Sequence, residues 1–529
     1  MVDEAHSTNL WPLAAAFWER ECLAAGADPN DARLVGSICF AYDEPDFLGL
    51  AGAPMGSDGA RWLAERYVSG LPRSVRSAHG RFYTPRSLAS ILVERALQEP
   101  IPEEGVIVDP ACGAGSLLTA ATEILVATRP PEDAVRTVVG RLRGTDLDPV
   151  AARLCELAVR VALLPAWMAI PDSQRPAIPR LATVTDGLAD TAPAALVLAN
   201  PPFGRRRLSA EQRLRHAPVL YGHAHLPSLF LHAAVERLSR GGVAAFVVPT
   251  SVVGGAYYQR LREFLIKTAP PQWLAFIDDR SGVFTGDVLQ EALLGVFVRG
   301  RRSLTVSVRR VGSSPSFGGA EHVVSRASWV GKRPWLIARD PDDVSLVAAA
   351  TARKHRLSDY GWKVSTGPLV WNRHRDQLFP RNSRGRIPVI WASDVRPEGV
   401  DPFESRPGRF IEPRSGQEWL ALTKPAILVQ RTTAPEQPRR IIAGVLDEGT
   451  LEELGGCVVV ENHLNICTWS GEGILTHERL HDYLMSEEAD RLYRCMSGSV
   501  AVSAFELGEL PLPPPEDFSS EDERARRAA

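Results

Sequence analysis

The chain has 529 residues, of which 45% are hydrophobic and 23% are charged, and its net charge is −3. It therefore has enough apolar surface for sizeable cores, and its length predicts two to four domains. No stretch approaches the roughly 18 consecutive apolar residues of a membrane helix, and the acidic start MVDEAHSTNL is unlike a secretory signal. Seven cysteines without CxxC spacing favour neither a disulfide framework nor a zinc site. We expect a cytoplasmic protein with reduced thiols, no metal and no membrane partner.

The sequence pattern predicts four parts along the chain. Residues 1–78 contain helix-like stretches such as LWPLAAAFWERECLAAG, and residues 79–300 alternate between strand-like and helix-like segments. Residues 301–510 are less regular and rich in Gly, Pro, Arg and Trp, so we expect a mixed α+β region there. Residues 511–529 are first Pro-rich and then charged, which predicts a disordered tail.

The alternating part predicts a parallel sheet. Strand-like GVIVD, RLRGTD, LVLAN and GVAAFVVP are separated by helix-like segments such as PVAARLCELAVRVALL and LPSLFLHAAVERLSR. Such βαβ units indicate an α/β fold with a doubly wound, mostly parallel sheet. Ligands of these sheets bind at the carboxyl ends of the strands, so polar residues at those ends are the candidates for function.

The first such end is VDPACGAGSLL. Asp109 ends the strand, and Gly113 with Gly115 forms a tight turn that leads into a helix. The third glycine of the dinucleotide fingerprint is missing, because Leu118 stands at that position. An acidic residue before a short Gly-x-Gly turn suits a ligand with a cationic amino group and no pyrophosphate. An ordinary strand-to-helix turn is the alternative interpretation.

Two further strand ends carry acidic residues. In RGTDLDP, Asp146 is placed to accept hydrogen bonds from ribose hydroxyls, and Leu147 to cover a face of an adenine. Helix capping, a role open to Asp148 in any case, is the alternative for this string. In ATVTDGL, Asp186 is placed to accept from an adenine amino group.

The fourth end is LVLANPPFG, where a buried strand stops at Asn200, Pro201, Pro202 and Phe203. The two prolines stiffen the backbone and remove its donors. If the Asn200 side-chain oxygen and the Pro201 carbonyl accept the two hydrogens of an exocyclic amino group, its lone pair becomes available to an electrophile. A proline turn that only closes a strand is the alternative.

Taken together, DPACGAG, TDLDP, TDG and NPPF resemble the class I methyltransferases that use S-adenosylmethionine, and within them the enzymes that methylate amino groups in DNA. The upstream string GRFYTPRSLASILVERAL resembles the cofactor-contacting segment of the gamma-type adenine-N6 enzymes. The resemblance implies a Rossmann-like catalytic domain over residues 79–300. Its implied cofactor contacts are Tyr83, Thr84, Asp109, Ala111, Gly113, Gly115, Asp146, Leu147 and Asp186. Read alone, Thr84 and Pro85 are a helix N-cap and first helical residue.

The resemblance also implies what the catalytic string does. Asn200, Pro201 and Pro202 form the catalytic turn, and Phe203 stacks on the target adenine. Because a protein cannot reach that nitrogen inside a duplex, the adenine is flipped out of the helix. Phe284, in GVFTGDV, is a further candidate contact to the base, with a core position as the alternative.

The region that follows is basic. Residues 301–440 hold 25 Lys and Arg against 13 Asp and Glu, a net +12, whereas residues 441–529 carry a net −12. Arginines interleaved with aromatic residues suit a polyanion with stackable bases, although an ordinary solvated surface has the same composition. Residues 301–510 weakly resemble the target-recognition regions of restriction-modification methylases. The candidate contacts to double-stranded DNA are Arg373, Arg375, Arg431, Arg439 and Arg440.

The leading interpretation is an adenine-N6 DNA methyltransferase of a restriction-modification or related defence system, acting as a monomer. The alternatives are an N4-cytosine enzyme, an NPP-motif enzyme that methylates RNA or protein, and a DNA-binding protein with a decayed catalytic domain. The roughly 80 residues before the motifs are too few for an ordinary endonuclease domain, so any cognate endonuclease is expected to be a separate chain.

Overall fold

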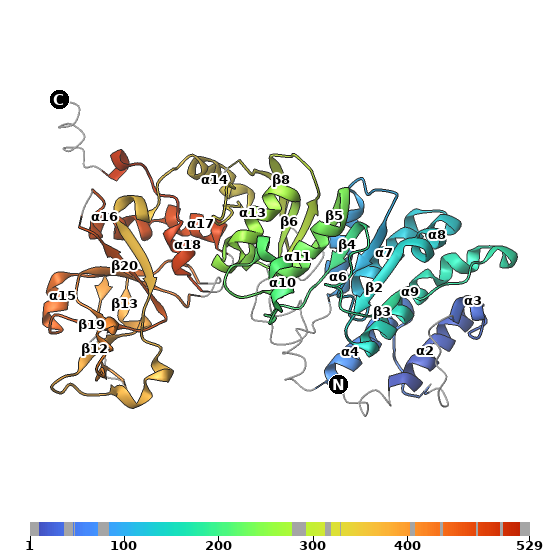
Figure 1. Ribbon diagram of the computed structural model, residues 1–529, viewed down its shortest axis with the longest axis horizontal. Coiled ribbons are helices and arrows are strands. Elements are labelled where there is room, and N and C mark those ends of the chain that lie inside the picture. Colours follow the sequence, from blue (N-terminus) through green and yellow to red (C-terminus); the bar gives the residue numbers. More distant parts are fainter. Residues whose placement is uncertain are drawn as a thin grey trace. The chain divides into compact units, whose positions relative to one another are not determined.

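The computed structural model describes residues 10–35, 46, 48–71, 84–277, 292–312, 319–327, 329–401, 408–433, 437–471, 474–497 and 501–518. The chain forms two compact units (Figure 1), each described by itself below. Unit 1 consists of Met1–Pro249 and Glu263–Glu321, and unit 2 of Thr250–Arg262 and His322–Ala529. No helix among the described residues is long and apolar enough to cross a membrane.

Unit 1 is built on one sheet. Its strands are β1 Val106–Asp109, β2 Leu142–Asp146, β3 Ala182–Val184, β4 Ala194–Ala199, β5 Leu238–Pro249, β6 Pro271–Ile277, β7 Ala292–Val298 and β8 Thr305–Val311. They lie in the order β3-β2-β1-β4-β5-β7-β6-β8. Only β7 is antiparallel to its neighbours, and the other pairs are parallel. This doubly wound, mostly parallel sheet confirms the predicted fold class.

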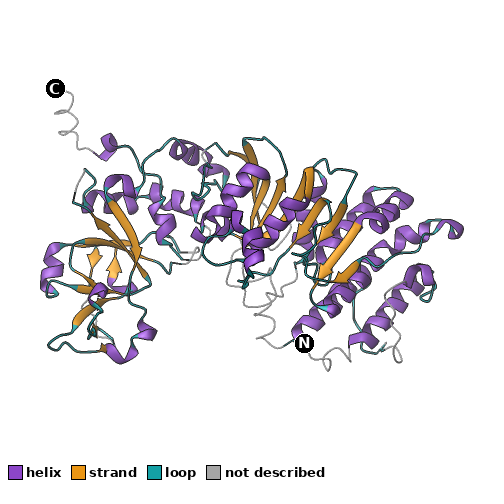
Figure 2. Ribbon diagram, viewed as in Figure 1, coloured by secondary structure: helices purple, strands orange, loops and turns teal. Residues whose placement is uncertain are grey.

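Helices lie on both faces of the sheet (Figure 2), and its inner strands, such as β4 and β7, are buried throughout. Every residue of β4 is buried, and Leu196 and Leu198 join one core cluster while Val197 between them faces the other side. A strand covered on both faces is therefore apolar without alternation, as in LVLA. The described helices of this unit are α2 Leu10–Ala25, α3 Ala32–Val35, α4 Gly56–Gly70, α6 Arg86–Leu97, α7 Ser116–Thr128, α8 Pro131–Arg141, α9 Pro149–Ala169, α10 Ala210–Arg215 and α11 Leu226–Arg237. The helix α12 Ser251–Gly254 belongs to unit 2, and α13 Gln259–Thr268 begins in unit 2 and ends in unit 1.

The N-terminal helices α2 and α4 pack against α9. Tyr67 of α4 donates a hydrogen bond to the Asp148 carboxylate at 2.6 Å, and the other oxygen of Asp148 caps the first turn of α9. The buried Arg160 of α9 donates to the Leu34 carbonyl at 2.7 Å. The described N-terminal helices are thus part of unit 1.

Unit 2 is a mixed α+β structure, as predicted, with small sheets in the orders β10-β20-β17-β18 and β11-β15-β12-β19-β16. Its strands are β9 His322–Ser325, β10 Trp362–Thr366, β11 Leu378–Phe379, β12 Ile387–Ile390, β13 Val395–Arg396, β14 Gly399–Val400, β15 Phe410–Ile411, β16 Ala421–Leu422, β17 Ala426–Gln430, β18 Ala443–Leu446, β19 Val458–Val460 and β20 Leu464–Trp469. Its remaining helices are α14 Val344–Thr351, α15 Glu448–Glu453, α16 His477–Leu484, α17 Glu487–Met496 and α18 Ala504–Gly508.

Two predicted boundaries differ from the structure. The sheet continues past residue 300, because β8 pairs in parallel with β6; as a half-exposed strand containing two arginines, it lacks the apolar run of the inner strands. The tail predicted as disordered from residue 511 is instead packed over 511–518: Leu512 is fully buried, and the Phe518 ring contacts Tyr360 and Tyr483. Residues 519–529 lie outside the described part of the chain.

Candidate active site

The predicted site residues of unit 1 meet at one edge of the sheet. β1 ends at Asp109, β2 ends at Asp146, and Asn200 follows β4 directly. β1 lies between β2 and β4, and the strand order reverses between β1 and β4. In doubly wound sheets the crevice beside this reversal is where ligands bind. The glycine turn after β1 and the NPPF turn after β4 therefore border the same crevice.

The glycine turn requires its glycines. Gly113 and Gly115 have φ values of +50° and +88°, in the left-handed region that disfavours other residues. A Cβ atom on Gly115 would lie 2.8 Å from the Cys155 Sγ and 3.0 Å from its Cα, so α9 packs directly on the turn. The Gly113 amide donates to the Asp146 carboxylate at 2.9 Å, which ties the turn to the end of β2.

Asp109 lies beneath this turn with 2% of its surface exposed, and it accepts a hydrogen bond from the Ala111 amide at 3.0 Å. Burial raises the pKa of its carboxyl to about 8; the Ala111 bond opposes this shift, and the charge of Asp146 adds to it. A buried acid of this kind is stabilised as a carboxylate when a cation lies beside it. Asp109 therefore suits a ligand with an ammonium group.

The other acidic strand ends are also held in place. Asp146 accepts from the Asp148 amide at 2.8 Å as well as from the glycine turn. Leu147 beside it is 67% exposed, so a large apolar side chain is presented to solvent at the end of β2. Asp186 accepts from the Arg206 guanidinium at 2.8 Å, a partner that the sequence pattern did not indicate.

In the NPPF turn, the Asn200 side-chain nitrogen donates to the Thr84 hydroxyl at 3.0 Å. Thr84 is 3% exposed and precedes α6, which begins at Arg86. The prediction that Thr84 caps this helix is therefore wrong: the N-cap position is Pro85, and no side chain caps the helix. The Thr84 hydroxyl instead orients the Asn200 carboxamide, whose oxygen lies at the opposite end of the amide. Phe203 is partly buried against the core.

Two predicted contacts, Tyr83 and Phe284, lie outside the described residues. Among the residues that the structure describes, no group of three or more His, Cys, Asp or Glu side chains is arranged to hold a metal ion.

A basic segment, residues 204–226, follows the NPPF turn and was not among the residues predicted from the sequence. Its ends are joined by hydrogen bonds from the Leu226 amide to the Gly204 carbonyl at 2.8 Å and from the Arg206 amide to the Ala224 carbonyl at 3.0 Å. Within it, Ser209 and Gln212 form a capping box that starts α10. Its exposed arginines are Arg205, Arg207, Arg213 and Arg215. The string RRR directly after NPPFG was the sequence feature that could have identified this segment.

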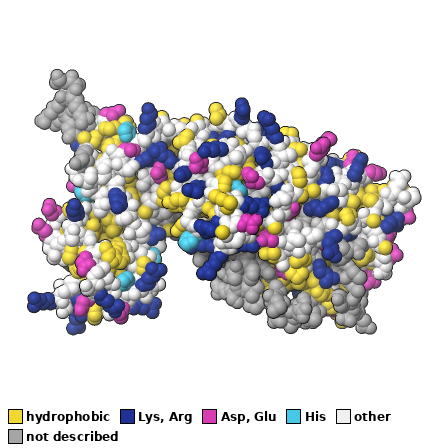
Figure 3. All heavy atoms as spheres, in the orientation of Figure 1, with side chains coloured by type: hydrophobic (Ala, Val, Ile, Leu, Met, Phe, Trp, Pro, Cys, Tyr) yellow, Lys and Arg dark blue, Asp and Glu magenta, His cyan; other side chains and the backbone are white. Residues whose placement is uncertain are grey.

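The five arginines predicted in unit 2 differ in exposure. Arg373 and Arg375 are exposed, and the Arg375 guanidinium lies 5.0 Å from the centre of the Trp371 ring. Figure 3 shows Lys and Arg side chains along the edge of unit 2 where β12 lies in Figure 1.

The other three predicted arginines are less accessible. Arg431 and Arg439 are half-buried and donate to the backbone carbonyls of Asn462 and Ser486. Arg440 is 3% exposed and donates to the Thr433 carbonyl, so burial removes it from the candidates for DNA contact.

Comparison with known proteins adds the following. A family model described as N-6 DNA Methylase matches residues 65–272. The Type II methyltransferase M.BsuBI of Bacillus subtilis is 24% identical over 460 residues, covering 83% of this chain and 88% of that protein. The Type II methyltransferase M.PstI of Providencia stuartii is 24% identical over 329 residues, covering 59% and 64%. The solved type IIG restriction endonuclease BpuSI aligns with a TM-score of 0.49 at 14% identity, covering 98% of this chain and 71% of that one.

The matched residues 65–272 include the glycine turn, the acidic strand ends and the NPPF turn. The geometry at the carboxyl edge of the sheet and the family match thus point to the same chemistry. The chain is an adenine-specific DNA methyltransferase whose residues 65–272 match the N-6 DNA Methylase family model.

Proposed function

We propose that this chain is the site-specific modification enzyme of a restriction-modification system and that it methylates N6 of a flipped-out adenine in duplex DNA. The observation that carries the catalytic part is the Asn200 carboxamide, held by Thr84 at the end of β4, beside the glycine turn. The likeness to two Type II methyltransferases supports the restriction-modification part. A cognate restriction endonuclease is the proposed partner in that system, and the methyltransferase would act on DNA as a monomer.

S-adenosylmethionine is the proposed cofactor, and the residues at the crevice fit it. Asp109 suits its ammonium group, the exposed Leu147 suits one face of its adenine, and Asp146 is placed for its ribose. Asp186, now paired with Arg206, is proposed to accept from the adenine amino group. When bound, this cofactor supplies a methyl group that passes from its sulfur to the target N6, which then loses one proton.

The chain's own residues prepare the nitrogen for that transfer. The lone pair of an adenine amino group is delocalised into the ring, so the group is a poor nucleophile. The Asn200 Oδ1 and the Pro201 carbonyl accept its two hydrogens, which lets the nitrogen become more tetrahedral. Because Thr84 and the prolines hold both acceptors in advance, little reorganisation is needed during the reaction. Phe203 stacks on the base outside the duplex.

Both units offer arginines for the DNA backbone. In unit 1, the segment after the NPPF turn adjoins the catalytic residues and exposes four arginines. In unit 2, Arg373 and Arg375 are the exposed members of the predicted set. Phosphate contacts of this kind position a protein on DNA, and contacts to base edges select the sequence.

The test is to incubate the purified chain with unmethylated bacterial DNA and S-adenosylmethionine and to map modified bases by single-molecule sequencing. We expect N6-methyladenine within one short motif. Asn200→Ala should lose the modification while still binding the cofactor in calorimetry, because this side chain acts on the base. An active Asn200→Ala variant would contradict the mechanism. Modified cytosine, or modification without a sequence motif, would contradict the proposed function.

A further inference from the structure

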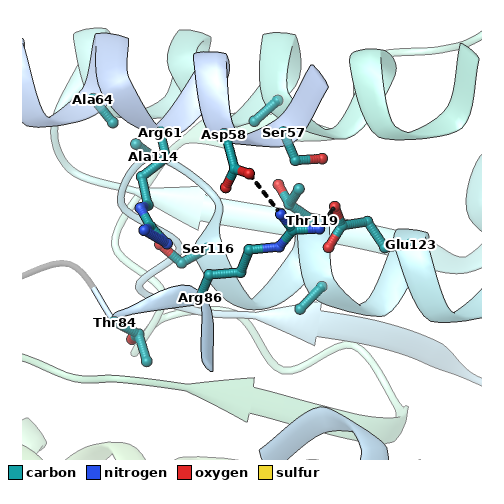
Figure 4. Close-up of a pocket in the computed structure, with 12 residues that line it drawn as sticks. Ser57, Asp58, Arg61, Ala64, Thr84, Arg86, Ala114, Ser116, Thr119 and Glu123 are labelled. Atoms are coloured by element: carbon teal, nitrogen blue, oxygen red, sulfur yellow. Dashed lines mark hydrogen bonds and ion pairs between the residues drawn. The ribbon is translucent and has the colours of Figure 1, made fainter. Parts of the chain in front are cut away.

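A pocket in unit 1 lies between α4, α6 and α7 (Figure 4). Thr84, Ala114 and Ser116 line the end beside the glycine turn, and Ala114 stands between the two glycines of that turn. The N-terminal helix α4 supplies another wall, with Asp58 and Arg61. The pocket therefore joins the N-terminal helices to the proposed cofactor site within the same unit.

The arginines of this pocket differ in whether their guanidinium nitrogens have hydrogen-bond partners. Arg86 of α6 is paired with Asp58 at 2.8 Å and with Glu123 at 3.0 Å, so its guanidinium already has two carboxylate partners. Arg61 is different: 36% of its side chain is exposed and its Nε lies 3.3 Å from the Glu65 carboxylate, but its Nη1 atom is enclosed without a hydrogen-bond partner among the described residues. Figure 4 shows the Arg61 side chain extending from α4 toward Ser116 at the start of α7.

A buried guanidinium nitrogen without a partner has lost its hydration and gained nothing in return. An anion in the pocket would remove that cost, and carboxylate is an anion that guanidinium groups bind well through charge-assisted hydrogen bonds. Ser116 adds a hydroxyl group at the same end of the pocket.

We infer that Arg61 binds the carboxylate of the amino-acid portion of the cofactor. This inference rests on the proposed use of S-adenosylmethionine. In that arrangement Asp109, beneath the glycine turn, takes the ammonium group, and Arg61, in the pocket beside the turn, takes the carboxylate. Two opposite charges from separate parts of the chain then recognise the two charges of one zwitterion. The N-terminal helices thereby contribute a cofactor-binding residue.

The test compares two ligands that differ only in this carboxylate: S-adenosylmethionine and its decarboxylated analogue. Binding of each to the full chain is measured by calorimetry. The wild-type chain should bind S-adenosylmethionine about ten- to a hundredfold more tightly than the analogue, the range expected for charged hydrogen bonds. Arg61→Ala should lose most of this preference by weakening only the carboxylated ligand, and Arg61→Lys should keep part of it.

The matched control is Arg66→Ala, on the same helix, because Arg66 is exposed and stacks on Trp62. This variant should keep the full preference. If Arg61→Ala weakens both ligands equally, or neither, the inference is wrong, and so it is if the wild-type chain binds both ligands equally well. If the wild-type chain binds neither ligand, the proposed function itself fails.

Discussion

The hydrogen bond from Asn200 to Thr84 makes a quantitative prediction about catalysis. In Thr84→Val, a methyl group replaces the hydroxyl that accepts from the Asn200 amide nitrogen at 3.0 Å. The two side chains have nearly the same shape, and the site is 3% exposed, so packing should change little. The variant should therefore bind the cofactor almost normally but hold the Asn200 oxygen less well against the target amino group.

The size of the effect follows from the bond that is removed. A neutral hydrogen bond contributes about 0.5–1.5 kcal/mol net. At about 1.4 kcal/mol per tenfold change in rate, the methyl-transfer step should slow by roughly 2- to 12-fold. A larger decrease is expected if the buried amide nitrogen finds no other acceptor, because an unsatisfied buried donor costs about 1–3 kcal/mol.

The assay is a single-turnover measurement on unmethylated duplex DNA with saturating cofactor, accompanied by calorimetric binding of the cofactor. Thr84→Ser is the control, since it keeps the hydroxyl and should transfer the methyl group at close to the wild-type rate. The resemblance to the gamma-type enzymes implied a direct cofactor contact for Thr84 instead. A Thr84→Val variant with weakened cofactor binding and an unchanged single-turnover rate would support that role and refute the positioning role.

Two further predictions concern charge. The pKa of Asp109, raised to about 8 by burial, exceeds the unfolded value near 4, so the folded chain holds a proton that the unfolded chain lacks. The free energy of unfolding should therefore fall by about 2 kcal/mol from pH 6 to pH 8. In urea denaturation, the Asp109→Asn variant should lack this decrease. An equal decrease of the unfolding free energy in the wild-type chain and the variant would contradict the prediction. Replacing Arg213 and Arg215 by Ala should make the slope of log K for DNA binding against log salt concentration shallower. The change should be about 0.9 for each phosphate that the chain no longer neutralises. Arg129→Ala, at the opposite edge of the sheet, should leave this slope unchanged, and equal slopes for all variants would contradict the role of the basic segment.

Much of the fold of the catalytic domain could be predicted from the sequence, because the patterns that indicate it span only a few consecutive residues. A buried parallel strand is a short apolar run, and the residue after it lies at the carboxyl edge of the sheet whatever else the chain does. LVLAN thus predicted both β4 and the position of Asn200, and VIVD did the same for β1 and Asp109. Where the pattern was weaker, prediction failed: α8, which is polar on average, was not singled out, and β8 was placed outside the sheet.

The hydrogen-bond and ion-pair partners of the site residues could not be predicted from the sequence, because they come from distant segments. Thr84 and Asn200 are 116 residues apart, and nothing in TP or NPPF indicates a bond between them. The pairing of Arg206 with Asp186 depends on how the segment after β4 folds back. The burial of Arg440 was equally hidden, since an arginine in a basic cluster has the same local sequence whether it is solvated or enclosed.

The sequence by itself therefore determined the order of the elements, the class of sheet and the chemical groups at the strand ends, since each depends on a few consecutive residues. Only the tertiary structure decided which of those groups are buried, which way the Asn200 amide faces and which cation lies beside the glycine turn. These properties depend on desolvation and on contacts between helices far apart in the chain. Local propensity carries no information about such contacts.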